Sequence, residues 1–438
     1  MAIDISPHSN AYLFGDGRSV QRKEWLFLFP AAGLSVLGIM LLSGSEPDYL
    51  SGLRLWHKQT IWTLFGVGVA LTVSRIPIRF LVRLAIPFYL LNLSILVGIF
   101  WVGTQKGGAT SWLHLGYFTF QPSELTKLAT ILILARVLVP DKDNDPGLPN
   151  LLKAIVYAAI PAVLIAAQPD LGTAMIFAPI LLAALYGSRL PRKYILILLS
   201  PLWALVALPN QFLPWIIWGS GVGLWLAIQA FSGESGRRLF MYAATQLVVV
   251  LIVLNTTHFL WNSVLKDHQK GRLVGFVDAG ETVSTRDLRG SQYHLRQSLI
   301  AIASGGLIGQ GLGEGMQSSH GFIPMMRTDF IFAMLAEEGG FASSILLLSL
   351  FALLLVQTSR AAAIADTWAE NTVVFGILGM WAGHVFINIG MTMGLVPITG
   401  IPLPFVSYGG SSVLTNFIAL GLALSVLRRG RWQEDLSV

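Results

Sequence analysis

The sequence predicts an all-α polytopic membrane protein with about 10–12 transmembrane helices and a large extracytoplasmic loop. Of its 438 residues, 54% are hydrophobic and only 12% are charged, whereas a soluble domain carries about 25% charged residues. The mean hydropathy is +0.66. These values exclude an ordinary soluble enzyme, a disordered chain and a secreted mini-protein. The sequence has no cysteine, which excludes disulfides, thiol nucleophiles, Cys-ligated zinc and iron–sulfur clusters.

Twelve apolar runs approach the length of about 20 residues that a helix needs to cross the hydrocarbon core. They cover residues 25–43, 59–74, 78–102, 123–140, 151–168, 171–188, 194–209, 213–231, 238–262, 329–356, 372–393 and 411–428. We expect a cytosolic tail at 1–23, because no cleavable signal peptide is visible. One transmembrane domain at 24–428 and a second cytosolic tail at 429–438 follow.

The distribution of Lys and Arg places both termini in the cytosol, because the cytoplasmic loops of membrane proteins are enriched in these residues. The net charge of +6 therefore gives no reason to expect a nucleic-acid partner. The segment 263–328 falls on the outer side and is long, polar and basic. It is either a solvated loop or a surface that attracts an anionic ligand.

Polar and ionisable residues inside or beside spans are costly and therefore mark candidate sites. At the start of the span 123–140, Glu124 and Lys127 lie three residues apart and share one helix face. They either form an ion pair at the membrane interface or line a cavity at the outer end of the membrane. Trp112 and Gln121 precede them in the same cluster.

Three further polar segments interrupt apolar runs. Asp170 either caps the next helix or contacts a ligand. Asp329 precedes the adjacent acids Glu337-Glu338, which need structural or functional partners inside an apolar run. The segment 397–412, which contains Ser411, is rich in Pro and Gly. Non-helical backbone at membrane depth must be buried in protein or face a water-filled cavity, so this stretch suggests a cavity.

The outer segment contains carboxylates, and one of them could act as a general base toward a sugar hydroxyl, although most loop carboxylates are only solvated. The candidate residues of this segment are Asp267, Asp278, Glu281, Asp287, Tyr293, His294, Gln297 and Ser298. The glycine run from Gly305 to Gly315 lacks the strand–turn–helix context of a nucleotide site. We expect it to form a flexible re-entrant or surface loop.

Taken together, long motifs in this chain resemble the SEDS family (shape, elongation, division, sporulation), polytopic bacterial proteins that polymerise the glycan strands of peptidoglycan. The motifs are FQPSELTKLA at 120–129, QPDLGT at 168–173, YHLRQSLIAIASGGLIGQG at 293–311, TDFIFAMLAEE at 328–338 and INIGMTMGLVPITGIPLPFVSYGGSS at 387–412. Within the RodA/FtsW/SpoVE group, Tyr293-His294 and the INIGM and PITG stretches resemble the RodA branch. Gly-Leu-Gly at 311–313 resembles FtsW. RodA is the favoured branch.

The resemblance implies a glycosyltransferase that uses lipid II, the undecaprenyl-pyrophosphate-linked disaccharide pentapeptide, as donor and acceptor in cell elongation and shape. The 4-hydroxyl of the acceptor GlcNAc would attack the anomeric carbon of the donor MurNAc, and the lipid pyrophosphate would leave. Asp287 matches the position of the family's essential acid, which would take the hydroxyl proton. Asp278 is the runner-up for this role.

The resemblance also implies a substrate cavity, a partner and a location. The cavity wall would be built from Trp112, Gln121, Glu124, Lys127, Asp170, Gln297, Ser298, Asp329 and Ser411. The basic loop, Lys127 or a divalent cation (Mg2+ or Mn2+) would supply the positive charge that the leaving group needs; the sequence itself assigns no cofactor and no metal ligand. The implied partner is a class B penicillin-binding protein, a transpeptidase, in the elongation or division complex of the bacterial cytoplasmic (inner) membrane.

The sequence departs from the family pattern in several places. Ser111 stands where an Arg usually precedes Trp112, and Met325 and Arg327 replace a Glu and a His. The prolines that usually follow the two loop acids are missing. The family has fewer spans than this chain, so we expect 213–262 to be an extra helix pair.

Two other functions stay open on the sequence alone. A transporter that flips a lipid-linked precursor would use the same cavity and charges without making a bond. The chain shows no convincing internal repeat, which weighs against transporters built from inverted repeats. A non-catalytic scaffold of the cell-wall machinery would only recruit other proteins, and the departures at Ser111, Met325 and Arg327 keep this alternative open.

Overall fold

The computed structural model describes most of the chain outside the region 192–290. The described residues are 24–44, 54–106, 109–115, 118–139, 147–191, 291–323 and 325–435, with the single positions 195, 223 and 236. The chain divides into two compact units, Met1–Arg189 with Arg272–Val438, and Leu190–Gly271. All elements named below belong to the first unit.

Helices dominate the described part of this unit. In chain order they are α1 Glu24–Ser43, α2 Leu55–Val73, α3 Ile78–Arg83, α4 Ala85–Val102, α5 Pro122–Val137, α6 Leu148–Ala167, α7 Leu171–Met175, α8 Phe177–Tyr186, α13 Ser291–Ser304, α14 Met316–Ser319, α15 Ile331–Ala363, α16 Trp368–Thr392 and α17 Gly410–Asp435. A small antiparallel sheet lies between α4 and α5 in the sequence. Its strands are β1 Thr104–Lys106, β2 Ala109–Leu115 and β3 Phe118–Phe120.

The predicted fold class, a polytopic helical membrane protein, is confirmed. In the described part of the chain, α1, α4, α6, α15, α16 and α17 are the 6 helices long and apolar enough to cross a membrane. Nine of the twelve predicted spans fall on described helices. The other three, 194–209, 213–231 and 238–262, fall almost entirely outside the described residues.

Two predicted spans are each divided into two helices, and a proline explains each division. The span 78–102 is divided into α3 and α4 at Leu84, and 171–188 is divided into α7 and α8 at Ile176. A proline ring clashes with the carbonyl four residues earlier and removes a helical hydrogen bond. Pro87 and Pro179 stand three residues after Leu84 and Ile176, so each ends the preceding helix at this point.

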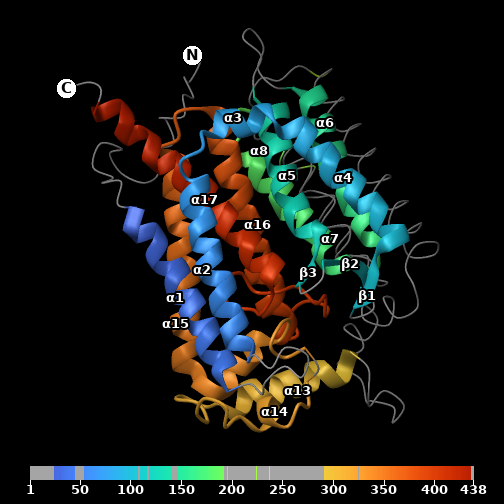
Figure 1. Ribbon diagram of the computed structural model, residues 1–438, viewed down its shortest axis with the longest axis vertical. Helices are drawn as coiled ribbons and strands as arrows, with labels where there is room; N and C mark the ends of the chain where they lie inside the picture. The colour runs from blue at the N-terminus through green and yellow to red at the C-terminus, as the bar shows by residue number, and fades with distance from the viewer. Residues whose placement is uncertain are drawn as a thin grey trace. The chain divides into compact units, whose positions relative to one another are not determined.

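Helix α5 lies in the middle of the bundle. It packs against α3, α4, α6, α8, α16 and α17, and Figure 1 shows it between α4 and α16. Most of its 16 residues are buried. A helix with neighbours on all sides needs apolar side chains all around it. Residues 128–135 supply them, except for Thr130, whose hydroxyl donates to the carbonyl of Thr126 at 2.9 Å. The polar residues of its first turn are therefore buried as well.

The long helix α15 is broken at Gly340, which has a φ of 67°. The break releases backbone groups that a straight helix would pair. The glycine-rich turn after α13 provides their partners: the N–H of Gln310 donates to the carbonyl of Glu337 at 3.0 Å, and the N–H of Phe341 donates to the carbonyl of Gly306 at 2.9 Å. The turn and the broken helix are therefore joined by their backbones.

The turn lies at the surface, as expected for the glycine run from Gly305 to Gly315: Leu307 and Ile308 are 76% and 86% exposed. The structure shows a hydrogen-bonded turn whose tight path depends on glycine. Positive φ angles occur at Gly306, Gly309, Gly311 and Gly313. The described part of the segment 263–328 contains the helices α13 and α14.

The segment between α16 and α17 is non-helical, as expected from its Pro and Gly content, and its second half, residues 401–407, is largely buried. Ile401 and Leu403 are each 1% exposed. Side chains satisfy its backbone: Asn388 Nδ2 donates to the carbonyl of Ile401 at 2.6 Å. The hydroxyl of Ser407 accepts from the N–H of Leu403 at 2.8 Å and donates to the carbonyl of Thr328 at 2.6 Å. These bonds hold irregular backbone inside the bundle.

We expect Gly309→Ala to destabilise the protein more than Gly306→Ala does. Both glycines have a positive φ, which costs an alanine about 1–2 kcal/mol. A β-carbon at Gly309 would also overlap the carbonyl oxygen of Glu338, whereas one at Gly306 would meet nothing within 4 Å. Overpacking adds about 1–3 kcal/mol. Thermal unfolding of both purified variants in detergent measures the difference, and equal melting temperatures would show that the turn does not lock α15.

Candidate active site

The candidate site begins at the N-terminus of α5. Pro122 is the first helical residue and Gln121 is the extended N-cap, a combination that suits a helix start. Glu124 and Lys127 follow in the first turns, and each side chain is 1% exposed; Lys127 Nζ lies 2.9 Å from Glu124 Oε1. The expected ion pair is therefore present, and neighbouring helices bury it.

A third ionisable residue, His384 of α16, contacts the lysine of this pair. Its Nε2 lies 2.9 Å from Lys127 Nζ, and its Nδ1 lies 2.9 Å from the carbonyl oxygen of Pro402. Sequence reasoning did not single out His384. The available signal was an ionisable side chain in the apolar run 372–393, which by itself marks a functional candidate.

Gln121 joins α5 to two other helices. Its side-chain Nε2 donates to Asp170 Oδ2 at 2.9 Å, and its backbone N–H donates to Ser411 Oγ at 3.1 Å. Asp170 Oδ1 accepts from the N–H of Thr173 at 3.1 Å, so the expected helix cap on α7 is confirmed. Burial raises the pKa of Asp170, and the hydrogen bonds from Thr173 partly offset this rise.

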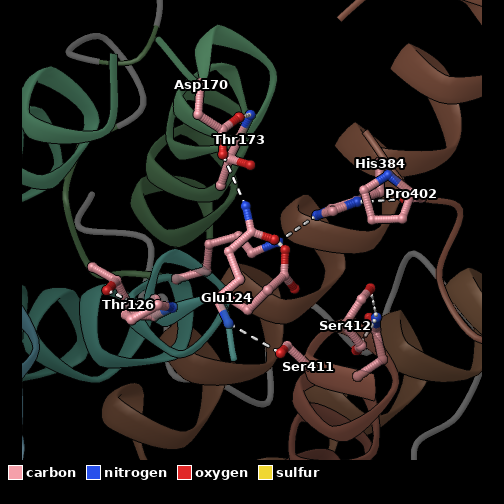
Figure 2. A network of polar contacts seen from close by, with 12 residues as sticks. Glu124, Thr126, Asp170, Thr173, His384, Pro402, Ser411 and Ser412 are labelled. Atoms are coloured by element: carbon pink, nitrogen blue, oxygen red, sulfur yellow. Dashed lines mark hydrogen bonds and ion pairs between the residues drawn. The ribbon is translucent and has the colours of Figure 1, made fainter. Parts of the chain in front are cut away.

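These contacts bring together side chains from four helices. Figure 2 shows Glu124, Asp170, His384 and Ser411 converging from α5, the start of α7, α16 and α17. The second carboxylate oxygen of Glu124 is buried and has no hydrogen-bond partner among the described residues. A buried carboxylate oxygen left in this state is costly. The network therefore keeps an acceptor for a donor group of a ligand or of water.

An apolar cavity adjoins the polar network. It has a volume of about 410 Å³ and is lined by Ile61, Trp62 and Phe65 of α2, Thr119 and Phe120 of β3, and Gly410, Ser411 and Leu414 of α17. Ser411 belongs to both regions, because it lines the cavity and also accepts the hydrogen bond from Gln121. An amphipathic ligand could place its apolar part in the cavity and its polar part near α5.

The remaining predicted site residues have different surroundings. Ser298 of α13 is buried and donates to the carbonyl of Thr392 at 2.9 Å, which fixes α13 to the end of α16. Gln297, next to it, is half-buried. Trp112 pairs with Thr104 across β2 and β1. The contacts of Ser298 and Trp112 are therefore structural.

The sequence singled out four further acids. The carboxylate of Asp329 lies next to Gly400: a β-carbon added at Gly400 would be 3.2 Å from Asp329 Oδ2. Glu337 accepts from the N–H groups of Gln317 at 2.7 Å and Ser318 at 3.0 Å, so its partner is structural: it caps α14. Asp287 and Asp278, the two candidate bases, lie outside the described residues.

We expect Lys127→Met and Glu124→Gln each to destabilise the protein by about 3–5 kcal/mol, because each leaves a buried charge without its partner. The double variant should lose less stability than either single variant, since it removes both charges together. Thermal unfolding of the purified proteins measures these effects. Losses that simply add would contradict the assignment of a mutually dependent buried pair.

Comparisons with known proteins cover almost the whole chain. The profile of the FtsW/RodA/SpoVE family, described as cell cycle proteins, matches residues 23–215 and 224–431. Peptidoglycan glycosyltransferase RodA of Treponema pallidum (strain Nichols) is 35% identical, with 94% of this chain and 99% of the relative covered. Peptidoglycan glycosyltransferase MrdB of Escherichia coli (strain K12) is 33% identical, with 96% and 97% covered.

The structural comparison agrees with the sequence comparison. A solved structure described as "Structural coordination of polymerization and crosslinking by a peptidoglycan synthase complex" has a TM-score of 0.66 at 26% identity, over 92% of this chain and 97% of that one. The identities with RodA and MrdB exceed the 30% identity with a probable FtsW of Thiomicrospira cyclica. This confirms the resemblance to the RodA branch, and the chain belongs to the FtsW/RodA/SpoVE, or SEDS, family.

Proposed function

We propose that this multi-pass membrane protein is a peptidoglycan glycosyltransferase that uses lipid II as donor and acceptor in cell elongation. The names of the RodA and MrdB relatives support the reaction class. The observation that carries the proposal is the buried charged network of Glu124, Lys127 and His384 next to an apolar cavity. This combination suits a substrate with a polar head and a hydrocarbon tail.

The cavity would take part of the polyprenyl chain. Its volume of about 410 Å³ lies within the usual range of about 300–1,000 Å³ for ligand pockets. Its lining is largely aromatic and aliphatic, and Ser411 brings it against Gln121. The pyrophosphate and sugars would then lie beside the polar network at the N-terminus of α5.

The chemistry joins two substrate molecules. The 4-hydroxyl oxygen of the acceptor GlcNAc forms a bond to the anomeric carbon of the donor MurNAc, while the bond from that carbon to the lipid pyrophosphate breaks. Asp287 takes the hydroxyl proton as general base. Lys127 stabilises the charge that develops on the leaving pyrophosphate, and Glu124 orients the ammonium through their 2.9 Å contact.

A divalent cation is the other candidate source of positive charge. Among the described residues, no group of three or more His, Asp or Glu side chains is arranged to hold a metal ion. Lys127 would supply this charge from the chain itself. The remaining candidates for substrate contacts are Trp112, Gln121, Asp170, Gln297, Ser298, Asp329 and Ser411.

The proposal includes a partner and an orientation in the membrane. The similar structure is a peptidoglycan synthase complex, which supports a class B penicillin-binding protein as the partner that cross-links the new strand. The excess of Lys and Arg in the alternate loops supports cytosolic termini. With this orientation, the loop that contains Asp287 would lie on the extracytoplasmic side of the bacterial inner membrane.

We expect Asp287→Asn to abolish glycan polymerisation, because the amide keeps the shape of the side chain but cannot accept the proton. Loss of a general base lowers a rate by about 10²–10⁴-fold. The assay supplies purified protein, labelled lipid II and the cognate penicillin-binding protein, and gel electrophoresis measures glycan polymer. Asp278→Asn is the matched control and should keep its activity.

Each other result has a definite meaning. Polymerisation retained in Asp287→Asn but lost in Asp278→Asn would move the base to Asp278. Polymer formed by both variants would refute the base assignment. If the unchanged protein forms no polymer but moves labelled lipid II across vesicle membranes, the transporter alternative replaces the enzyme. If it does neither, the scaffold alternative remains.

A further inference from the structure

We propose that His384 is a positioning residue that joins the Lys127 ammonium to the carbonyl of Pro402. The non-helical segment between α16 and α17 thereby determines where the positive charge of the site lies. The proposal rests on the proposed function only in assuming that Lys127 serves the reaction. The contact itself is a feature of the fold and can be tested without activity.

The two contacts of His384 define which ring nitrogen carries the proton. The carbonyl oxygen of Pro402 can only accept a hydrogen bond, so the Nδ1 that lies 2.9 Å away must donate. The neutral ring then has an acceptor at Nε2, and the ammonium of Lys127, which can only donate, lies 2.9 Å from it. This tautomer is assigned from the hydrogen-bond network. It leaves His384 as an uncharged acceptor for a buried cation.

The surrounding structure holds both His384 and Pro402 in place. His384 is 2% exposed, and Pro402 lies between Ile401, whose carbonyl accepts from Asn388, and Leu403, whose N–H donates to Ser407. A lysine side chain has about 2 kcal/mol of rotamer entropy to lose when it is held in one place. Contacts to Glu124 and His384 from two different helices hold the ammonium before any substrate arrives.

The same segment also touches the other side of the network. A β-carbon at Gly172 of α7 would overlap the carbonyl oxygen of Thr399 and would lie 2.9 Å from the side chain of Ile401. Thus residues 399–402 pack against the helix that Asp170 caps and, through His384, against Lys127. A displacement of residues 399–402 would therefore disturb the surroundings of Asp170 and of Lys127 together.

The experiment compares two substitutions at His384 with one on the same helix. His384→Gln keeps one acceptor for Lys127 and one donor for Pro402, whereas His384→Leu removes both. Trp381→Phe is the control, because it removes another buried hydrogen bond of α16, from Trp381 Nε1 to Asn416 Oδ1 at 2.8 Å, and keeps the two contacts of His384. We expect kcat for lipid II polymerisation to fall about tenfold or more in His384→Leu, a change equivalent to about 1.4 kcal/mol.

The pattern among the variants separates positioning from a general loss of packing. His384→Gln should recover most of kcat, KM should change less than kcat in His384→Leu, and Trp381→Phe should keep kcat even if its melting temperature falls. A loss of kcat in Trp381→Phe as large as in His384→Leu would overturn the proposal. So would a failure of His384→Gln to exceed His384→Leu when both fold.

A double-mutant cycle in thermal stability tests the contact independently of activity. If His384 acts through Lys127, His384→Leu should lower the melting temperature of the Lys127→Met variant by less than about half of its effect in the unchanged protein, because residues in contact are not additive. Full additivity would overturn the proposal, whatever the polymerisation assay shows. Coupling in stability without any polymerisation in the unchanged protein would support the contact and refute only the proposed function.

Discussion

A buried ammonium group sets the requirements for the structure around it. Lys127 is 1% exposed, and the effective penalty for taking such an ion out of water is several kcal/mol. Glu124 and His384 replace its hydration at 2.9 Å each. Each partner must itself be held, Glu124 by the first turn of α5 and His384 by the Pro402 carbonyl. The packing of α5 against α16 encloses this charge together with its partners.

The same physical requirement governs the backbone where the helices are interrupted. Backbone groups without partners are not tolerated at membrane depth, and this bundle satisfies them in two ways. At Gly340 in α15, the partners are backbone groups of the glycine-rich turn. Between α16 and α17, the partners are the side chains of Asn388, His384 and Ser407. His384 therefore satisfies an irregular backbone and a buried cation with one ring.

Local patterns predict the local part of this structure. Apolar runs locate the helices, and the spacing of Glu124 and Lys127 correctly places them on one face. The sequence does not reveal that this face is buried, because that depends on how many helices surround α5. His384 lies 257 positions from Lys127, and no spacing rule joins residues so far apart. The three-stranded sheet is missed because two strands have only 3 residues, too few to show alternation.

In the proposed function, Ser411 would link recognition of the two halves of an amphipathic substrate. Its hydroxyl lies at the edge of the apolar cavity and accepts from the N–H of Gln121, which in turn binds Asp170. The hydrocarbon part would contact α2 and α17, and the polar part would contact α5 and α16. Ser411 lies in the first turn of α17. A lipid that fills the cavity would therefore contact a residue that also holds Gln121 of the polar network. Binding energy from the non-reacting tail could then be used to position the reacting groups.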